Sequence, residues 1–393
     1  MKKLNILPLL LTIILAVSLT ACGAEPAQPT KAPAPSASDK GTPAAPNPPA
    51  AADKGSSNPE WNKILEAAGK EELVFGVHTV TGAQDFIETF KKAYPSIKVK
   101  GQAIKISQLA PRVVSEQRNN QFLWDVFVGP TANMMTVLEP AGSLTSMEPF
   151  LKPIDPKIKE DSAWGGGFEL FLNPDTRDAL IYELSEADWL AVNRDLAPES
   201  EISSSKQLLD PKWKNKIVIY DPSSATAGSK VLTKLMQLYG EEFVTKLIKE
   251  QSLVVTKDRR TATEWVATGR YPISIGVDTD VLTELQQQGV GKNVKLLGNG
   301  ENKHIEAWAI AVFKNAPNPN ATKVFLSWFL SKEGQEAWTK LTREGHTRRT
   351  DVKYDKPGRI DYSKFKSGEQ LIFTTKDSAK MIDKVVDMAS ANK

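Results

Sequence analysis

The stretch that decides the fold runs from Leu73 to Val99 and reads LVFGVHTVTGAQDFIETFKKAYPSIKV. Its first six residues form a β-rich run that ends at His78, and a turn of small and hydroxyl residues follows. Residues 84–94 carry apolar side chains at helical spacing and are closed by Pro95, and residues 97–100 form a second short β-rich run. A strand, a helix and a second strand in this order predict a βαβ unit with parallel strands.

The same alternation continues along the chain as far as Val277. It predicts helices over residues 108–119, 132–138, 227–239, 241–249, 261–268 and 279–287, and strands over residues 126–129, 217–221, 253–257 and 273–277. The folded part begins near Glu60 and holds about 330 residues, which is more than one hydrophobic core usually carries. We therefore expect an α/β protein with two sheets in two lobes.

The first residues predict export from the cytoplasm. Met1-Lys2-Lys3 is a short basic segment, and residues 4–19 are almost wholly apolar, as in a signal peptide. This apolar stretch is shorter than the ~20 residues that a helix needs to cross a bilayer, and it contains Pro8. It ends in Leu19-Thr20-Ala21-Cys22-Gly23, which resembles the lipobox of bacterial lipoproteins. We expect a signal peptide over residues 1–21 and a lipid on Cys22, which attaches the protein to the outer face of the cytoplasmic membrane or in the periplasm.

Residues 22–59 consist of this cysteine and a segment rich in proline and alanine. Such a segment cannot build a core, so we expect a disordered linker there. Cys22 is the only cysteine, so the sequence excludes an internal disulfide and a thiolate metal cluster. The chain has 50 basic and 47 acidic residues, and removing Lys2 and Lys3 with the leader leaves 48 against 47, a net charge of +1. This near-neutral charge argues against a nucleic-acid partner. We expect a monomer without a cofactor.

Several stretches, taken in order, resemble the extracellular solute-binding proteins of ABC importers, and among them the ferric-ion-binding group. They include Trp124-Asp125-Val126-Phe127-Val128-Gly129 and Ala307-Trp308-Ala309-Ile310-Ala311-Val312, and the other matches lie in residues 73–78, 90–99, 191–196, 208–217, 313–319 and 325–335. The resemblance implies a type II periplasmic-binding-protein fold of the Venus-flytrap kind, with hinge strands between two α/β lobes. Lobe 1 is expected to cover residues 60–183 and 306–393, and lobe 2 residues 187–303. The resemblance also implies a ligand held between the lobes, ABC permease subunits as partners, and no enzymatic activity.

Ligands of open α/β sheets bind beyond the carboxyl ends of the strands, where loops and helix N-termini meet. Small hydroxyl residues and helix N-termini favour an anion there, and tryptophans near strand ends can form the wall of a pocket. The candidate ligand-binding residues are His78, Thr79, Thr81, Trp124, Thr131, Trp164, Ser223, Ser224, Thr226, Arg259, Arg260, Asp278, Thr279, Trp308 and Arg348. The alternatives are structural: helix caps for serine and threonine, a solvated charge pair for one arginine of residues 259–260, and core packing for the tryptophans.

Ferric-binding members use two adjacent tyrosines after the second-lobe strand that here ends in Gly276-Val277. This chain has Asp278-Thr279-Asp280 in that place and contains no Tyr-Tyr pair. His78, Asp278 and Asp280 could still form a hard-metal site with nitrogen and oxygen ligands. Because the phenolates are missing, we expect a small organic or phosphorus-containing anion rather than ferric iron. Because carboxylates and aromatic rings bind polyamines, the two aspartates and Trp124 keep a polyamine as an alternative ligand.

Two other classes of function follow less well from the sequence. An exported hydrolase is disfavoured because there is no Gly-x-Ser-x-Gly, His-Glu-x-x-His or Gly-x-x-x-x-Gly-Lys-Ser/Thr motif, and His78, His304 and His346 are far apart in sequence. A ligand-sensing or adhesion lipoprotein could use the same two lobes without a transporter, and the sequence does not discriminate against it. The expected mechanism is capture followed by lobe closure, with no bond made or broken.

Overall fold

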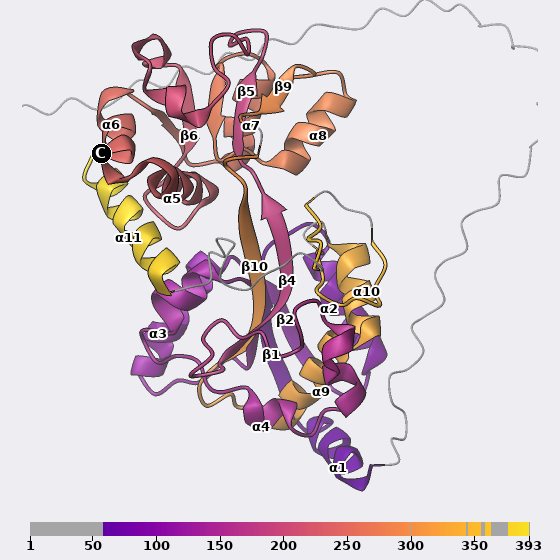
Figure 1. Ribbon diagram of the computed structural model, residues 1–393. Helices are drawn as coiled ribbons and strands as arrows, with labels where there is room; N and C mark the ends of the chain where they lie inside the picture. Colours follow the sequence, from indigo (N-terminus) through magenta and orange to yellow (C-terminus); the bar gives the residue numbers. More distant parts are fainter. Residues whose placement is uncertain (1–57, 299, 343–344, 355–357, 363–375, 393) are drawn as a thin grey trace, which may run out of the picture. The chain divides into compact units, whose positions relative to one another are not determined.

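The computed structural model describes residues 58–298, 300–342, 345–354, 358–362 and 376–392 (Figure 1). By its internal contacts the chain divides into two units, Met1–Pro48 and Pro49–Lys393, and all described residues belong to the second unit. The predicted signal peptide, Cys22 and nearly all of the predicted linker lie outside the described residues. Among the described helices, none is both long enough and apolar enough to cross a membrane.

The first sheet contains five strands in the order β2-β1-β3-β10-β4 (Figure 1). They are β1 (Glu72–Val77), β2 (Lys98–Ala103), β3 (Val126–Pro130), β4 (Ala179–Ala187) and β10 (His304–Val312). β1 runs parallel to β2 and β3, as the alternation of elements predicts. β10 runs antiparallel to both β3 and β4, so the sheet as a whole is mixed.

The second sheet also contains five strands, in the order β7-β6-β8-β5-β9. They are β5 (Leu190–Asn193), β6 (Ile217–Tyr220), β7 (Val254–Thr256), β8 (Ile273–Ile275) and β9 (Val294–Leu296). β6 runs parallel to β7 and β8, which are the three strands predicted by periodicity in this part of the chain. β5 runs antiparallel to β8 and β9, and this antiparallel edge follows from no pattern in the sequence.

Helices follow most strands. The α-helices are α1 (Pro59–Ala68), α2 (Ala83–Ala93), α3 (Ile106–Arg118), α4 (Glu148–Leu151), α5 (Ala227–Tyr239), α6 (Glu241–Glu250), α7 (Arg259–Ala267), α8 (Thr279–Gln287), α9 (Pro319–Leu330), α10 (Lys332–Leu341) and α11 (Lys376–Ser390). The shorter helices are the π-helical turn η1 (Met134–Leu138) and the 3₁₀ turns η2 (Pro156–Lys159), η3 (Asp161–Ala163), η4 (Ser205–Leu209) and η5 (Pro211–Trp213). The limits of α5 and α8 agree with the prediction. α7 begins two residues earlier than predicted because the Asp258 side chain caps it, accepting from the N–H of Thr261.

Both faces of each sheet are covered by helices, so each sheet is the middle layer of three. On the first sheet, one cluster of buried apolar residues includes α2, α9 and α10, and a second cluster includes α3 and η1. The second sheet has one cluster with α5 and α6 and a smaller one with α7 and α8. We call the first sheet with its helices the first lobe and the second sheet with its helices the second lobe.

β4 and β10 connect the two lobes and are hydrogen-bonded to each other from the Ala179–Ala311 pair to the Ala187–His304 pair. β4 is followed almost at once by β5 of the second sheet. The C-terminal helix departs from the expected division of the chain, which assigned residues 306–393 to lobe 1. α11 packs on α5 of the second lobe as well as on η1 of the first.

Asp125 joins three segments of the first lobe and is fully buried. Its carboxylate accepts hydrogen bonds from the backbone N–H groups of Val74 and Asn318, both at 2.8 Å, and from the Asn318 side chain at 3.0 Å. The start of β3 is therefore held to β1 and to the start of α9. Burial raises the pKa of Asp125 to about 6, and the hydrogen bonds oppose this rise.

We predict that Asp125→Asn lowers the free energy of unfolding at pH 7 by about 2 kcal/mol, because the amide turns an N–H₂ group toward donors that the carboxylate accepts. Since the pKa of Asp125 is above its ordinary value of 3.8, the folded state keeps a proton that the unfolded state loses between about pH 4 and pH 6. This residue therefore lowers the stability of the wild-type protein as the pH rises through that window, and the variant lacks the effect. Urea denaturation at pH 4 and pH 7 measures both quantities, with the exposed cap variant Asp155→Asn as control. Equal pH dependence of wild type and Asp125→Asn would contradict the prediction.

Candidate functional site

His78 lies at the end of β1, at the carboxyl edge of the first sheet. Its backbone N–H donates to the carbonyl of Val128 at 2.9 Å, and its Nδ1 accepts from the backbone N–H of Ile106 at 3.3 Å. With Nδ1 as acceptor, the neutral imidazole carries its proton on Nε2. The ring of Trp308 lies 5.5 Å away in an edge-to-face arrangement. The structure thus brings together two of the predicted residues, one from β1 and one from β10.

The surroundings of His78 are basic. Burial, followed by the positive charges of Lys105 and Lys230, lowers the pKa of His78 to about 4. Lys105 precedes α3 in the first lobe, whereas Lys230 belongs to α5 in the second. His78 is therefore neutral near pH 7, and cations from both lobes act on it.

Lys230 forms a buried ion pair with Glu306 of β10. Burial alone raises the pKa of Glu306, but Lys230 and His304 lower it to about 2, so the carboxylate stays ionised. His304 Nε2 lies 3.3 Å from Glu306, and the His304 ring lies 4.7 Å from the ring of Trp189. The second lobe is thus held to the connecting strand by a charge pair.

Trp189 lies between β4 and β5 and carries two cations on its ring. The guanidinium of Arg259 is 4.6 Å from the ring centroid and the ammonium of Lys230 is 5.5 Å from it. Arg259 donates to the carbonyls of Gly276 at 3.3 Å and Val277 at 2.7 Å. Within the described part of the chain no carboxylate pairs with Arg259, so its charge is not neutralised.

These residues form one group at the connection between the lobes, which we call the hinge cluster. It consists of His78, Trp189, Lys230, Arg259, His304 and Glu306. Two of its members, Lys230 and Arg259, are basic and Glu306 is an ionised acid, and Lys105 adds a further basic side chain beside the cluster. Such a group can receive an anion through charge-assisted hydrogen bonds, with aromatic rings beside it.

The hydroxyl residues before α5 act mainly as helix caps. Thr226 is the N-cap and forms a capping box with Ser229, and its hydroxyl donates to the carbonyl of Asp221 at 2.8 Å. The Asp221 carboxylate accepts from the backbone and the hydroxyl of Ser223. The Ser224 carbonyl accepts from the Ser229 hydroxyl at 2.7 Å, and its side chain is exposed. The structural alternative therefore applies to Thr226.

The loops before α7 and α8 divide in the same way. Arg260 is exposed and pairs with Glu264 one turn along the helix at 2.8 Å, so it is the solvated arginine of its pair. Asp278 caps α8 by accepting from the N–H groups of Asp280 and Val281. The other hydroxyl candidates are exposed in the turn after β1 or half-buried in the first turn of α8: Thr79, Thr81 and Thr279.

The predicted metal set of His78, Asp278 and Asp280 is not borne out. No group of three histidine, cysteine, aspartate or glutamate side chains in the described residues is arranged to hold a metal ion. The physical reason is the cap of α8, because a carboxylate that accepts two backbone N–H groups is turned toward its own helix.

Four further candidates are buried in the first lobe and contribute to its packing, and their assignment to ligand contact stays a prediction. The side chain of Trp124 donates to the Glu116 carboxylate at 3.1 Å, that of Trp164 to the Ile158 carbonyl at 2.8 Å, and that of Thr131 to the Ala307 carbonyl at 3.2 Å. The fourth, Arg348, is completely buried and donates to the carbonyls of Gly165, Gly167 and Ile181. Burial lowers the pKa of Arg348 to about 10.

Sequence reasoning missed four members of the hinge cluster: Trp189, Lys230, His304 and Glu306. Two of them had a readable signal. His304 and Glu306 stand two residues apart at the start of the otherwise apolar run HIEAWAIAV, and alternate residues of a strand share one face. Polar residues on one face of a buried strand need partners from another element.

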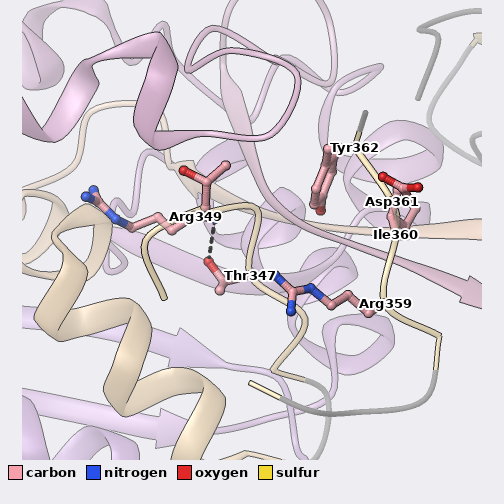
Figure 2. Close-up of a pocket in the computed structure, with 7 residues that line it drawn as sticks. Thr347, Arg349, Arg359, Ile360, Asp361 and Tyr362 are labelled. Carbon is pink, nitrogen blue, oxygen red and sulfur yellow. Dashed lines mark hydrogen bonds between the residues drawn. The ribbon is translucent and has the colours of Figure 1, made fainter. Parts of the chain in front are cut away.

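Two cavities of about 410 Å³ lie away from the hinge cluster. The first, shown in Figure 2, is lined by Thr347, Arg349, Thr350, Arg359, Ile360, Asp361 and Tyr362. The Arg349 guanidinium is not available to a ligand in this cavity, because it is hydrogen-bonded to Asp351 at 2.8 Å and to the Leu330 carbonyl. The second is lined by residues of the second lobe: Asn193, Asp195, Leu196, Ala267, Thr268, Gly269, Gly289, Gly291, Lys292 and Asn293. Neither contains a predicted ligand-binding residue.

Comparison with known proteins gives a family for most of this chain. The family described as bacterial extracellular solute-binding protein matches residues 85–357. An uncharacterized protein of Haemophilus influenzae is 34% identical over 137 residues, which cover 34% of this chain and 39% of that protein. The match thus spans well under half of the length of that relative.

This chain also matches solved structures of similar fold over nearly the whole length of those structures. Iron-bound HitA from Pseudomonas aeruginosa has a TM-score of 0.59 at 18% identity, covering 82% of this chain and 99% of its own. The ferric binding protein from Campylobacter jejuni has a TM-score of 0.61 at 20% identity, with the same coverage. AfuA from Actinobacillus pleuropneumoniae, bound to fructose-6-phosphate, has a TM-score of 0.54 at 21% identity and covers 81% of this chain and 98% of its own. These likenesses establish the type II two-lobed binding-protein fold.

We predict that His78→Gln removes a pH-dependent part of the stability. Because the pKa of His78 is lowered from 6.5 to about 4, the unfolded state takes up a proton in this interval that the folded state does not. The contribution of His78 to stability therefore increases as the pH rises from about 4 to 6.5, by up to about 3 kcal/mol. Urea denaturation of both proteins at pH 4.5 and pH 7 measures it. A difference between the two proteins that is the same at both pH values would contradict the prediction.

Proposed function

Since this chain belongs to the bacterial extracellular solute-binding protein family, matched over residues 85–357, we propose that it captures a small organic or phosphorus-containing anion at the hinge cluster. As a member of this family it is an extracytoplasmic binding component of an ABC importer, with a solute and a permease as partners. The lipid on Cys22, which holds the protein at the membrane while the permease receives the solute, is part of the proposal.

The observation that carries the proposal is the unneutralised guanidinium of Arg259. It lies over Trp189 with the ammonium of Lys230 beside the same ring. Of these two cations, Lys230 is paired with Glu306, whereas Arg259 has only backbone carbonyls and the ring. A half-buried arginine of this kind gains most from an anionic partner, because charge-assisted bonds to carboxylate or phosphate are about twice as strong as neutral ones.

The same charges disfavour a metal ion. Lys105 and Lys230 act on His78 and repel a metal cation, and the Asp278 carboxylate is engaged at the start of α8. Among the similar structures, four are described with iron or as ferric-binding proteins and one holds fructose-6-phosphate. The charges of the hinge cluster suit the binding of a phosphate ester better than the binding of ferric iron.

Capture follows from the position of the cluster. A solute held by Arg259 of the second lobe gains the Nε2–H of His78 from the first lobe. Because contacts from both lobes form in one arrangement only, the solute shifts the equilibrium between open and closed arrangements toward the closed one. The permease then distinguishes the closed arrangement from the open one.

The ligand class is tested with the chain from Gly23 onward, by tryptophan fluorescence and thermal shift. The panel contains phosphate esters, phosphonates, small carboxylates, polyamines, and Fe(III) with and without citrate. A shift with phosphate esters, phosphonates or carboxylates, and none with Fe(III) alone, supports the proposal. A shift with Fe(III) alone contradicts it and favours an iron-binding protein. Absence of any shift contradicts it in favour of a sensing or adhesion role.

We predict that Arg259→Gln weakens binding of the anion found in this panel by about 10-fold to 100-fold, because it removes a charge-assisted contact of about 1.5–3 kcal/mol. The neighbouring variant Arg260→Gln is the matched control, since Arg260 is exposed and paired with Glu264, and it leaves the affinity within about twofold. Isothermal titration calorimetry measures both. Equal losses in the two variants would exclude a specific role for Arg259, and a lower melting temperature of Arg259→Gln without ligand would identify a structural effect.

A further inference from the structure

The last helix, α11, is attached to both lobes. Its buried apolar residues recur on one face of the helix, at Ala379, Ile382, Val385 and Ala389. Ala379 belongs to the hydrophobic cluster of the first lobe that contains α3 and η1. Val385 belongs to the cluster of the second lobe that contains α5 and α6. One helix of 15 residues therefore contributes to two separate cores.

Polar contacts strengthen the attachment to the second lobe. Lys384 pairs with Glu241 at the start of α6 at 2.5 Å, and the Asn392 side chain donates to the carbonyl of Ile248 at 3.2 Å. The half-buried residues Met381 and Met388 pack against the cluster of α5 and α6. In Figure 1, α11 runs from the neighbourhood of α3 to that of α6.

The chain between α10 and α11 also contacts the hinge. Thr347 and Arg359 form antiparallel bridges with Glu183 and Ser185 of β4. The carbonyl of Gly358 accepts from the N–H of Glu186 at 2.8 Å, and a Cβ on Gly358 would approach the Glu186 carbonyl oxygen to 2.6 Å. The outer edge of the connecting strand is therefore lined by the C-terminal part of the chain, and α11 follows from there.

The family match ends at residue 357, and α11 begins at Lys376. The helix thus lies beyond the part of the chain that the family describes.

We propose that α11 is a brace between the lobes that limits their relative motion in the absence of solute. A rigid-body movement of one lobe against the other has to break the packing of α11 on η1 or its packing on α5, because one helix cannot follow both lobes. The brace therefore restricts the range of open arrangements. This inference concerns the solute-free protein and does not depend on the proposed ligand.

The test measures the distance between the lobes. Cys22 is the only cysteine, so the chain from Gly23 onward accepts two spin labels without interference. Lys92→Cys in the first lobe and Thr283→Cys in the second are exposed label sites. Val385→Asp places a charge in the second-lobe attachment, and we expect the distance distribution from double electron–electron resonance to widen at least about twofold.

Two controls separate the brace from general damage. Val255→Asp makes the same chemical change at an exposed position of β7 and leaves the distribution unchanged. A second label pair within the second lobe, Lys214→Cys with Thr283→Cys, keeps its distance if that lobe stays folded. Should Val385→Asp disturb the second pair, the milder variant Met388→Ser, whose side chain is half-buried at the same attachment, takes its place. An unchanged distance between the lobes in a variant with an intact second lobe overturns the proposal.

Discussion

The structure depends on the position of one strand, β10, which passes from the second lobe into the first sheet. Its ladder with β4 satisfies its backbone groups on one side and fixes its register. Its alternate side chains then point to one face, and each contacts a different part of the molecule. The contacts run in order along the strand: His304 with Trp189, Glu306 with Lys230, and Trp308 with His78. The hinge cluster is thus a consequence of a single strand that both lobes share.

The charges in this cluster are not equivalent. A buried ion pair such as Lys230 with Glu306 gains little stability over an apolar pair, because removing both charges from water offsets their attraction. Its effect is to fix geometry, since α5 can dock on β10 only where the two charges meet. Arg259 is different, because its partners are neutral carbonyls and an aromatic face. Lys230 therefore fixes structure, and Arg259 is the cation that we propose for the solute.

Parts of the structure that form through contacts between residues close in sequence could be predicted, whereas parts that form through contacts between distant residues could not. The limits of α5 and α8 can be predicted because the residue that caps each helix, Thr226 or Asp278, directly precedes it in the sequence. β5 and β9 cannot, although they are as short as the predicted β6, β7 and β8, because they pair antiparallel with strands distant in sequence and lie outside the strand–helix alternation. The candidate site was predicted less well for the same reason. Arg348 has a charge that suggests a ligand, but three distant carbonyls receive it, whereas the partner of Lys230 lies 76 residues further along the chain.

The C-terminal part of the chain adds a constraint on the hinge that the two connecting strands do not provide. Two hydrogen-bonded strands resist separation but bend and twist readily, so by themselves they leave the angle between the lobes poorly defined. A helix with apolar residues in the cores of both lobes opposes the bending directly, because bending exposes Ala379 or Val385 to water. The proposed solute site and the brace therefore both affect the angle between the lobes. In the proposed mechanism an anion at the hinge cluster stabilises the closed arrangement of the lobes, whereas α11 limits how far they separate without one.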